Sequence, residues 1–236
     1  MATEQRTIHG GNHLFYILGA VAVAVTVLVG FAKTYYLKTV FGTPSLTPLL
    51  HLHGLVMTLY VAIFIVQTWL VASHRTRIHR RLGVFGALLA AVVLVVGTTT
   101  IIVGTKLGHF PSPPPFRVPA IPLGELVVFG TLVTIGLYYR SKREIHRRLM
   151  LLSIFSLLPP AVGRIPMTFI ENHDLLMPAM LPDLIMLAFV AYDTFKFRRL
   201  HPAFAWGGLL IIATRPLCLM IGNTDAWLQF ASWLVR

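Results

Sequence analysis

Long apolar stretches, separated by short basic segments, make up most of this chain. A helix needs roughly 20 apolar residues to cross the hydrocarbon core of a bilayer, and seven stretches approach or exceed this length. They are residues 14–36, 48–72, 82–103, 121–139, 149–165, 181–195 and 203–221. Only 12% of the 236 residues are charged, whereas roughly a quarter are charged in a soluble domain. We therefore predict an all-α fold, with residues 1–236 forming one polytopic membrane domain of seven transmembrane helices.

The positions of the Lys and Arg residues predict how these helices are oriented. Of the 20 basic residues, 13 lie on the side of the N-terminus, nearly all within 75–81, 140–148 and 196–199, and 7 lie on the other side. Because loops rich in Lys and Arg stay in the cytoplasm, we expect a cytoplasmic N-terminus and an external C-terminus. The net charge of +12 forms no basic stripe with interleaved aromatic residues, which argues against nucleic acid as a partner.

One short sequence occurs twice, and a looser version occurs a third time. RIHRRLG at 77–83 is nearly repeated as EIHRRLM at 144–150, and RRLHPAF follows at 198–204. His79, His146 and His201 each precede an outward-going apolar stretch, which predicts one leading helix followed by three parallel hairpins. Three interpretations stay open. The histidines bind free N–H groups of the first helical turn, they bind haem b or a transition metal ion, or the His–Arg–Arg triplets bind an anion or a lipid headgroup.

A second set of histidines is predicted near the outer ends of the helices. These metal-binding candidates are His51, His53, His109 and His173. The single cysteine, Cys218, removes thiolate cages from consideration. His51 and His53 lie about 200° apart on a helix, so they share an ion only if that first turn is not helical. We expect one stripe of the second stretch to face the bundle interior, formed by His53, Met57, Tyr60, Phe64, Gln67 and His74.

Ionisable residues within apolar stretches are costly, and they usually face the interior of a helix bundle. A group of such residues lies near the outer helix ends: Glu125, Arg164, Asp183 and Arg215. We prefer Arg164 as the partner of Asp183, because their helices are consecutive. The alternative is an outward-opening polar pocket, with Tyr60 and Gln67 lining its inward continuation. Asp193 is expected to neutralise a basic corner, and Pro159 and Pro160 should kink a helix that packs inside the bundle.

The corner sequences resemble those of a family of predicted bacterial membrane proteins of unknown function. Members carry His-Arg-x-x-Gly after one helix and His-Arg-x-x-Met after a later one, matching His79, Gly83, His146 and Met150 within residues 48–221. The resemblance implies a location in the bacterial inner membrane and brings no established activity. A more distant similarity is to the cytochrome b membrane reductases, which place paired histidines on neighbouring helices. This chain lacks their histidines near both faces on two helix pairs.

For the function, the sequence leaves three classes open. The first is a membrane protein that binds haem or a metal ion through histidines and acts in redox or electron transfer. The second is a non-catalytic accessory or assembly subunit of a membrane complex, and the third is a transporter of a small solute or protons. The expected partners are the lipid bilayer and either another membrane protein or a second copy of the chain. The chain contains no HExxH, GxxxxGK or GxSxG motif, so no catalytic residue is assigned.

Overall fold

The computed structural model describes residues 2–110, 118–165 and 176–236, and this part of the chain is helical throughout its regular elements, with no β-strand. The all-α class is therefore confirmed. The elements are α1 (Ala2–Gly30), η1 (Ala32–Tyr36), α2 (Pro48–Ala72), α3 (Thr76–Lys106), α4 (Ala120–Tyr138), α5 (Arg143–Phe155), α6 (Pro159–Val162), α8 (Leu176–Phe197), α9 (Pro202–Gly222) and α10 (Asp225–Leu234). Five helical segments within this part are long and apolar enough to cross a membrane: α2, α3, α4, the α5–α6 segment and α9.

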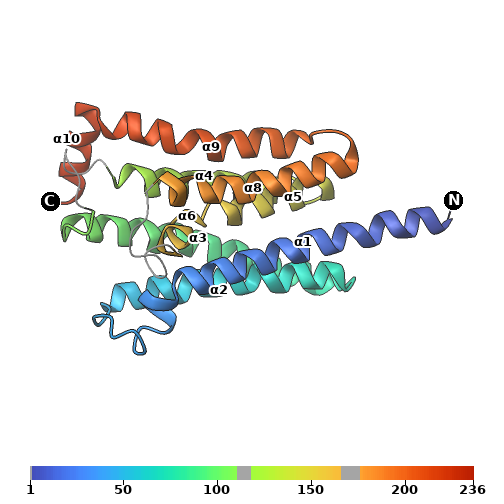
Figure 1. Cartoon of the computed structure of the whole chain (residues 1–236), viewed down its shortest axis with the longest axis horizontal. Helices are drawn as coiled ribbons and strands as arrows, with labels where there is room; N and C mark the ends of the chain where they lie inside the picture. The colour runs from blue at the N-terminus through green and yellow to red at the C-terminus, as the bar shows by residue number, and fades with distance from the viewer. Residues whose placement is uncertain (1, 111–117, 166–175) are drawn as a thin grey trace.

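The long helices run side by side along the long axis of the molecule, and the two chain ends lie at opposite ends of it (Figure 1). The connections from α2 to α3, from α4 to α5 and from α8 to α9 share one end, which we call the corner end. Two of the helices stop there in a left-handed residue, His74 at φ 60° and Arg198 at φ 56°. The next N–H then reaches back into the helix, as in Arg75 N–H to the Leu70 carbonyl at 2.8 Å.

The short helix α5 lies at the centre of the bundle. It contacts α1, α4, α8 and α9, and its residues Leu151, Leu152 and Ser153 are fully buried. The helix α4 is also surrounded by other helices, because it contacts α3, α5 and α9. The prediction that the fifth apolar stretch packs inside the bundle is thus confirmed.

Regular α-helix is interrupted after α5 and after α1. Pro159 and Pro160 lack the N–H that would continue the helix, so α5 ends at Phe155 and the chain resumes a helical turn only in α6. The predicted kink is confirmed. The first apolar stretch differs from its prediction, because α1 ends at Gly30 and the next turn is π-helical. Gly30 lies directly against the backbone of Ala161, where any side chain would collide with it.

Candidate functional site

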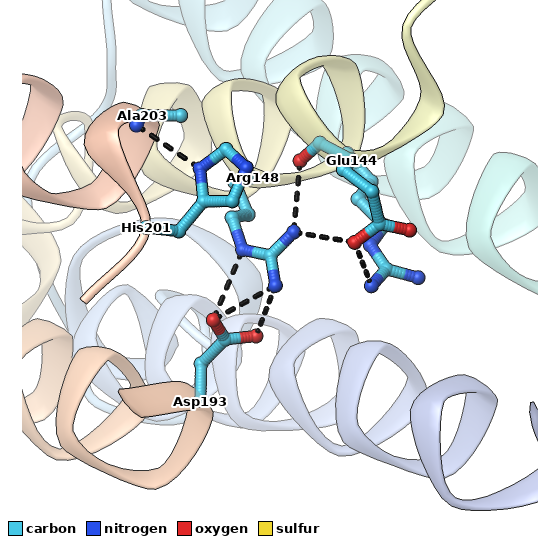
Figure 2. Close-up of polar contacts among 6 residues, drawn as sticks. Glu144, Arg148, Asp193, His201 and Ala203 are labelled. Carbon is cyan, nitrogen blue, oxygen red and sulfur yellow. Dashed lines mark hydrogen bonds and ion pairs between the residues drawn. The ribbon is translucent and has the colours of Figure 1, made fainter. Parts of the chain in front are cut away.

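Arg148, in the first half of α5, is almost completely buried, with 2% of its surface exposed. Its Nε and Nη2 donate to both carboxylate oxygens of Asp193 on α8, at 2.9–3.0 Å. Its Nη1 donates to the Glu144 carbonyl at 3.0 Å and to the Glu144 carboxylate at 2.6 Å (Figure 2). Each of the three guanidinium nitrogens therefore has an acceptor, and this contact, which we call the Arg148 clamp, joins α5 to α8. Asp193 neutralises a basic corner, as predicted.

The three residues His146, Arg147 and Arg148 point to three different neighbours, because successive helical residues are about 100° apart. His146 Nδ1 lies 2.7 Å from the Gly136 carbonyl of α4. The Arg147 guanidinium lies 5.1 Å from the ring centre of Tyr16 on α1, and Arg148 reaches α8. All three can find partners because α5 is central in the bundle.

The other copies of the corner sequence have different roles. On α3, which contacts α2 and α4, Arg80 and Arg81 are exposed and only His79 is partly buried. In the third copy, His201 precedes α9 and its Nδ1 accepts the N–H of Ala203 at 3.1 Å. The N–H capping interpretation is therefore right for His201. For His146 it is wrong, because the partner of its ring is a carbonyl.

His79 and His146 lie together, with ring centres 6.3 Å apart and ring planes at 74°; we call them the imidazole pair. The Gly136 carbonyl can only accept, so His146 carries a proton on Nδ1, and the tautomer of its neutral ring is the one with the lone pair on Nε2. His79 Nδ1 is buried and has no hydrogen-bond partner in the described chain, and the same holds for Gln67 Oε1 on α2. Gly136 lies ten residues before His146, and Trp69 lies ten residues before His79. The Trp69 carbonyl, however, already accepts both the N–H and the hydroxyl of Ser73.

His201 is not part of the imidazole pair. It lies near the Arg148 clamp, outside the long helices (Figure 2). Burial and the nearby Arg148 guanidinium lower the pKa of its imidazole from the usual value, while Asp193 and Glu144 act in the opposite direction. The neutral ring is the form that accepts the Ala203 N–H, so the lowered pKa and the hydrogen bond favour the same state.

A pocket lies between α4, α8, α9 and the break after α5, and we call it the carboxylate pocket. Its polar lining consists of Glu125, Ser156, Asp183, Thr214 and Arg215. Arg215 Nη1 and Asp183 Oδ2 are 3.1 Å apart, and both side chains are 22% exposed. The enclosed space has room for about one water molecule at most.

The ion pair of Asp183 differs from the prediction. The preferred partner was Arg164, but Asp183 on α8 pairs with Arg215 on α9, which packs against α8. The Arg164 guanidinium instead lies 4.8 Å from the ring centre of Phe31, and its Nη1 donates to the Pro160 carbonyl at 2.7 Å. Adjacency along the chain was thus a poor guide, because the break in the helix turns Arg164 toward α1.

Prolines lie near this pocket in three segments, at the break between α5 and α6 and inside the continuous helices α8 and α9. Pro159 and Pro182 line it directly, and Pro216 follows Arg215 inside α9. A proline inside a helix leaves the carbonyl four residues earlier without its helical donor.

A line of buried hydroxyl groups leads from the carboxylate pocket toward the imidazole pair. Ser156 lines the pocket, and its hydroxyl donates to the Ser153 carbonyl at 2.8 Å. The Ser153 hydroxyl donates to the Met150 carbonyl at 2.8 Å, and the Tyr60 phenol of α2 lies beside Ser153. We call Ser153, Ser156 and Tyr60 the hydroxyl line. His146, Met150 and Ser153 follow at helical spacings of four and three, so the imidazole pair lies on the same side of α5.

The remaining predicted site residues are scattered. His51 is exposed beside Tyr35, and His109 is exposed after α3. His53 is partly buried, its Nδ1 has no hydrogen-bond partner in the described chain, and His173 lies outside the described residues. Among the residues that the structure describes, no three His, Cys, Asp or Glu side chains are grouped closely enough to hold a metal ion. The predicted interior stripe of α2 extends from His53 to Gln67, whereas His74 is exposed in the turn beyond the helix.

Sequence reasoning missed the hydroxyl line and the burial of Arg148. Arg148 was used as a marker of orientation and as part of a His–Arg–Arg triplet that could bind an anion, because it belongs to a run of basic residues that looks solvent-exposed. Ser153 and Ser156 were overlooked, although two hydroxyls at a spacing of three in an apolar stretch are a usable signal for a polar helix side.

Searches of protein-family models, of curated proteins and of solved structures find no match to this chain. The resemblance drawn from the corner sequences therefore stays a prediction, and the function has to be argued from the site itself.

Proposed function

We propose that this protein is a polytopic protein of the bacterial inner membrane that conducts protons along α5. The route runs from the carboxylate pocket, through the hydroxyl line, to the imidazole pair at the corner end. In this proposal seven helices span the membrane and the basic corner end lies in the cytoplasm, as the Lys and Arg distribution predicts. The observation that carries the proposal is the buried hydroxyl line between two groups of ionisable side chains.

The carboxylate pocket favours a proton over a larger solute. Two carboxyl groups, Glu125 and Asp183, share it with the guanidinium of Arg215, and Asp183 pairs with Arg215, so Glu125 is left as a group that can take up and release a proton. The space is about that of one water molecule, which is too small for a metabolite. Ionisable residues within apolar helices mark ion pathways and proton relays.

Hydroxyl groups suit a proton route because each one both donates and accepts a hydrogen bond. Ser153 and Ser156 now donate to carbonyls of their own helix, and rotation of the hydroxyl frees them to bind water. Met150 separates the hydroxyls from the imidazole pair. His146 and Ser153 are seven residues apart, roughly 10 Å along the helix, so the route is closed here until water enters beside Met150.

The packing around the imidazole pair gives less support to a haem-binding function. A Cβ atom built on Gly83 would lie 3.4 Å from Gln67 Nε2, and one built on Gly136 would lie 3.1 Å from Met150 Sδ. These side chains fill the space in which the flat porphyrin ring would have to fit. An accessory or assembly function remains the main rival, and it predicts that the purified protein carries no flux.

Proton flux into liposomes with a trapped pH-sensitive dye, driven by a potassium diffusion potential, tests the proposal. We expect flux from the unaltered protein, and at least a tenfold loss in Glu125→Gln and in Ser153→Ala. Matched controls are Asp225→Asn, in the exposed first turn of α10, and Ser141→Ala, in an exposed corner, and both should retain the flux. Folding of each variant is checked by circular dichroism. If correctly folded unaltered protein is no more permeable than empty liposomes, the proposal is wrong.

A further inference from the structure

We infer that the imidazole pair is a site for one transition metal ion with a filled d shell, Cu(I) or Zn(II), and that this ion closes the proton route. The binding part of the inference stands on the geometry of the pair alone. The closing effect rests on the proposed function.

The orientation of His146 is that of a metal ligand. Histidines that bind metals usually donate their second ring N–H to a carboxylate or a backbone carbonyl, which fixes the tautomer and aims the other nitrogen at the metal. His146 Nδ1 makes such a contact with the Gly136 carbonyl at 2.7 Å. Its Nε2 is left with a lone pair for a ligand.

The separation of the two rings matches one shared ion. A metal–nitrogen bond is roughly 2.0–2.1 Å long. With the ring radius added on each side, the centres of two imidazoles on one ion are roughly 5 Å apart in a tetrahedral arrangement and roughly 6.3 Å apart in a linear one. The observed separation of 6.3 Å is that of a linear, two-coordinate ion, and a tetrahedral ion requires the two rings to move together by about 1 Å.

Two polar atoms near the pair still need partners. His79 Nδ1 and Gln67 Oε1 are both buried and have no hydrogen-bond partner in the described chain. Gln67 lies beside Gly83, one helical turn after His79. The amide oxygen of Gln67 and a water molecule could join the two imidazoles and so give Zn(II) its usual four tetrahedral ligands.

The surroundings of the pair also suit Cu(I). Arg80 adds a positive charge near His79, which costs a singly charged ion less than a doubly charged one. The Met150 thioether lies close to Gly136, whose carbonyl holds His146, and thioethers favour Cu(I). The two ions share the same imidazole chemistry, and the experiment distinguishes them.

A bound ion would occupy the nitrogen lone pairs at the corner end of the route. It would also tie α3 to α5 beside Met150, the point at which water has to enter. We therefore expect the metal to reduce proton flux while leaving the fold intact.

Metal binding is measured first, without any assay of flux. The purified protein is titrated with Zn(II), and separately with Cu(I) under reducing conditions, in competition with a chromogenic chelator, and the bound metal is counted by elemental analysis. We expect one equivalent per chain and at least a tenfold loss of affinity in His79→Gln and in His146→Gln. His109→Gln, at an exposed histidine, is the matched control and should bind normally.

X-ray absorption on the metal-loaded unaltered protein gives a second readout that does not depend on the folding of the variants. Imidazole scattering from two nitrogen ligands supports the site, and a spectrum without imidazole overturns it. Binding that survives in both folded variants also overturns it. If metal binds as expected but leaves an existing flux unchanged, only the closing effect is wrong. If the protein carries no flux at all, the proposed function fails while the metal site stands.

Discussion

Replacement of Asp193 by Asn removes the negative charge from the Arg148 clamp while nearly keeping the shape of the side chain. Arg148 is 2% exposed and Asp193 is 3% exposed, so solvent screens the interaction little. Removal of one partner from a buried ion pair costs roughly 3–5 kcal/mol. The Glu144 carboxylate still accepts from Arg148 Nη1 and compensates part of the charge. We therefore expect Asp193→Asn to lower the free energy of unfolding by about 3 kcal/mol.

The assay is reversible unfolding in mixed micelles with increasing denaturing detergent, followed by circular dichroism. The matched control is Asp183→Asn, which weakens the pair with Arg215, where both side chains are 22% exposed. That change should cost only about 1 kcal/mol or less. The double variant Arg148→Met with Asp193→Leu removes both charges and fills the same space, so it should be more stable than Arg148→Met alone.

Two results would refute this reasoning about the Arg148 clamp. One is a cost for Asp193→Asn no larger than that for Asp183→Asn, which would mean that the clamp is hydrated and not buried as described. The other is a double variant whose loss of stability equals the sum of the losses measured for Arg148→Met alone and for Asp193→Leu alone, because two residues in direct contact have to be coupled.

Three further changes test separate parts of the structure. Gly124→Ala should destabilise the fold by about 1–3 kcal/mol, because its Cβ would overlap the Cys218 sulfur, and adding Cys218→Ala should restore much of the loss in thermal unfolding. Met150→Ser should raise proton flux in liposomes by placing a hydroxyl at the closed point of the route, and unchanged flux would show that the barrier lies elsewhere. In the unaltered protein the folded state lowers the pKa of His201, so protonation favours the unfolded state. Stability therefore falls as pH falls through the usual histidine range. His201→Asn should make this fall in melting temperature between pH 8 and pH 5 less steep. Asn keeps a cap without titrating, so an equally steep fall in this variant would mean that another group is responsible.

The apolar stretches predicted the helices well, because length and composition alone decide which segments can form long apolar helices. The break at Pro159 and Pro160 was also predictable, because a missing N–H interrupts its own helix whatever packs around it. The end of α1 at Gly30 was not predictable in the same way. It depends on the close approach of Ala161, which lies more than a hundred residues further along the chain.

The candidate site was predicted residue by residue but not as an arrangement. Glu125, Asp183 and Arg215 were expected at one level and do share a pocket, since helix ends of similar depth can be counted from the sequence. The choice of Arg215 over Arg164 depends on which helices pack together, and apolar helix faces carry little information on that. The repeated corner sequence, likewise, gave no sign that only its second copy would be central.

The central position of α5 also bears on how the protein enters a membrane during synthesis. Among the five described segments that are apolar enough to span a membrane, the one formed by α5 and α6 is the least apolar and the most enclosed by protein. Arg148 finds its acceptors on Glu144 and on α8, and α8 follows it in the chain. A released α5 would expose this guanidinium to lipid before its main partner had been made. We therefore expect the segment to be held beside α4 in the insertion machinery until α8 emerges, and to pass into the bilayer only as part of that larger unit.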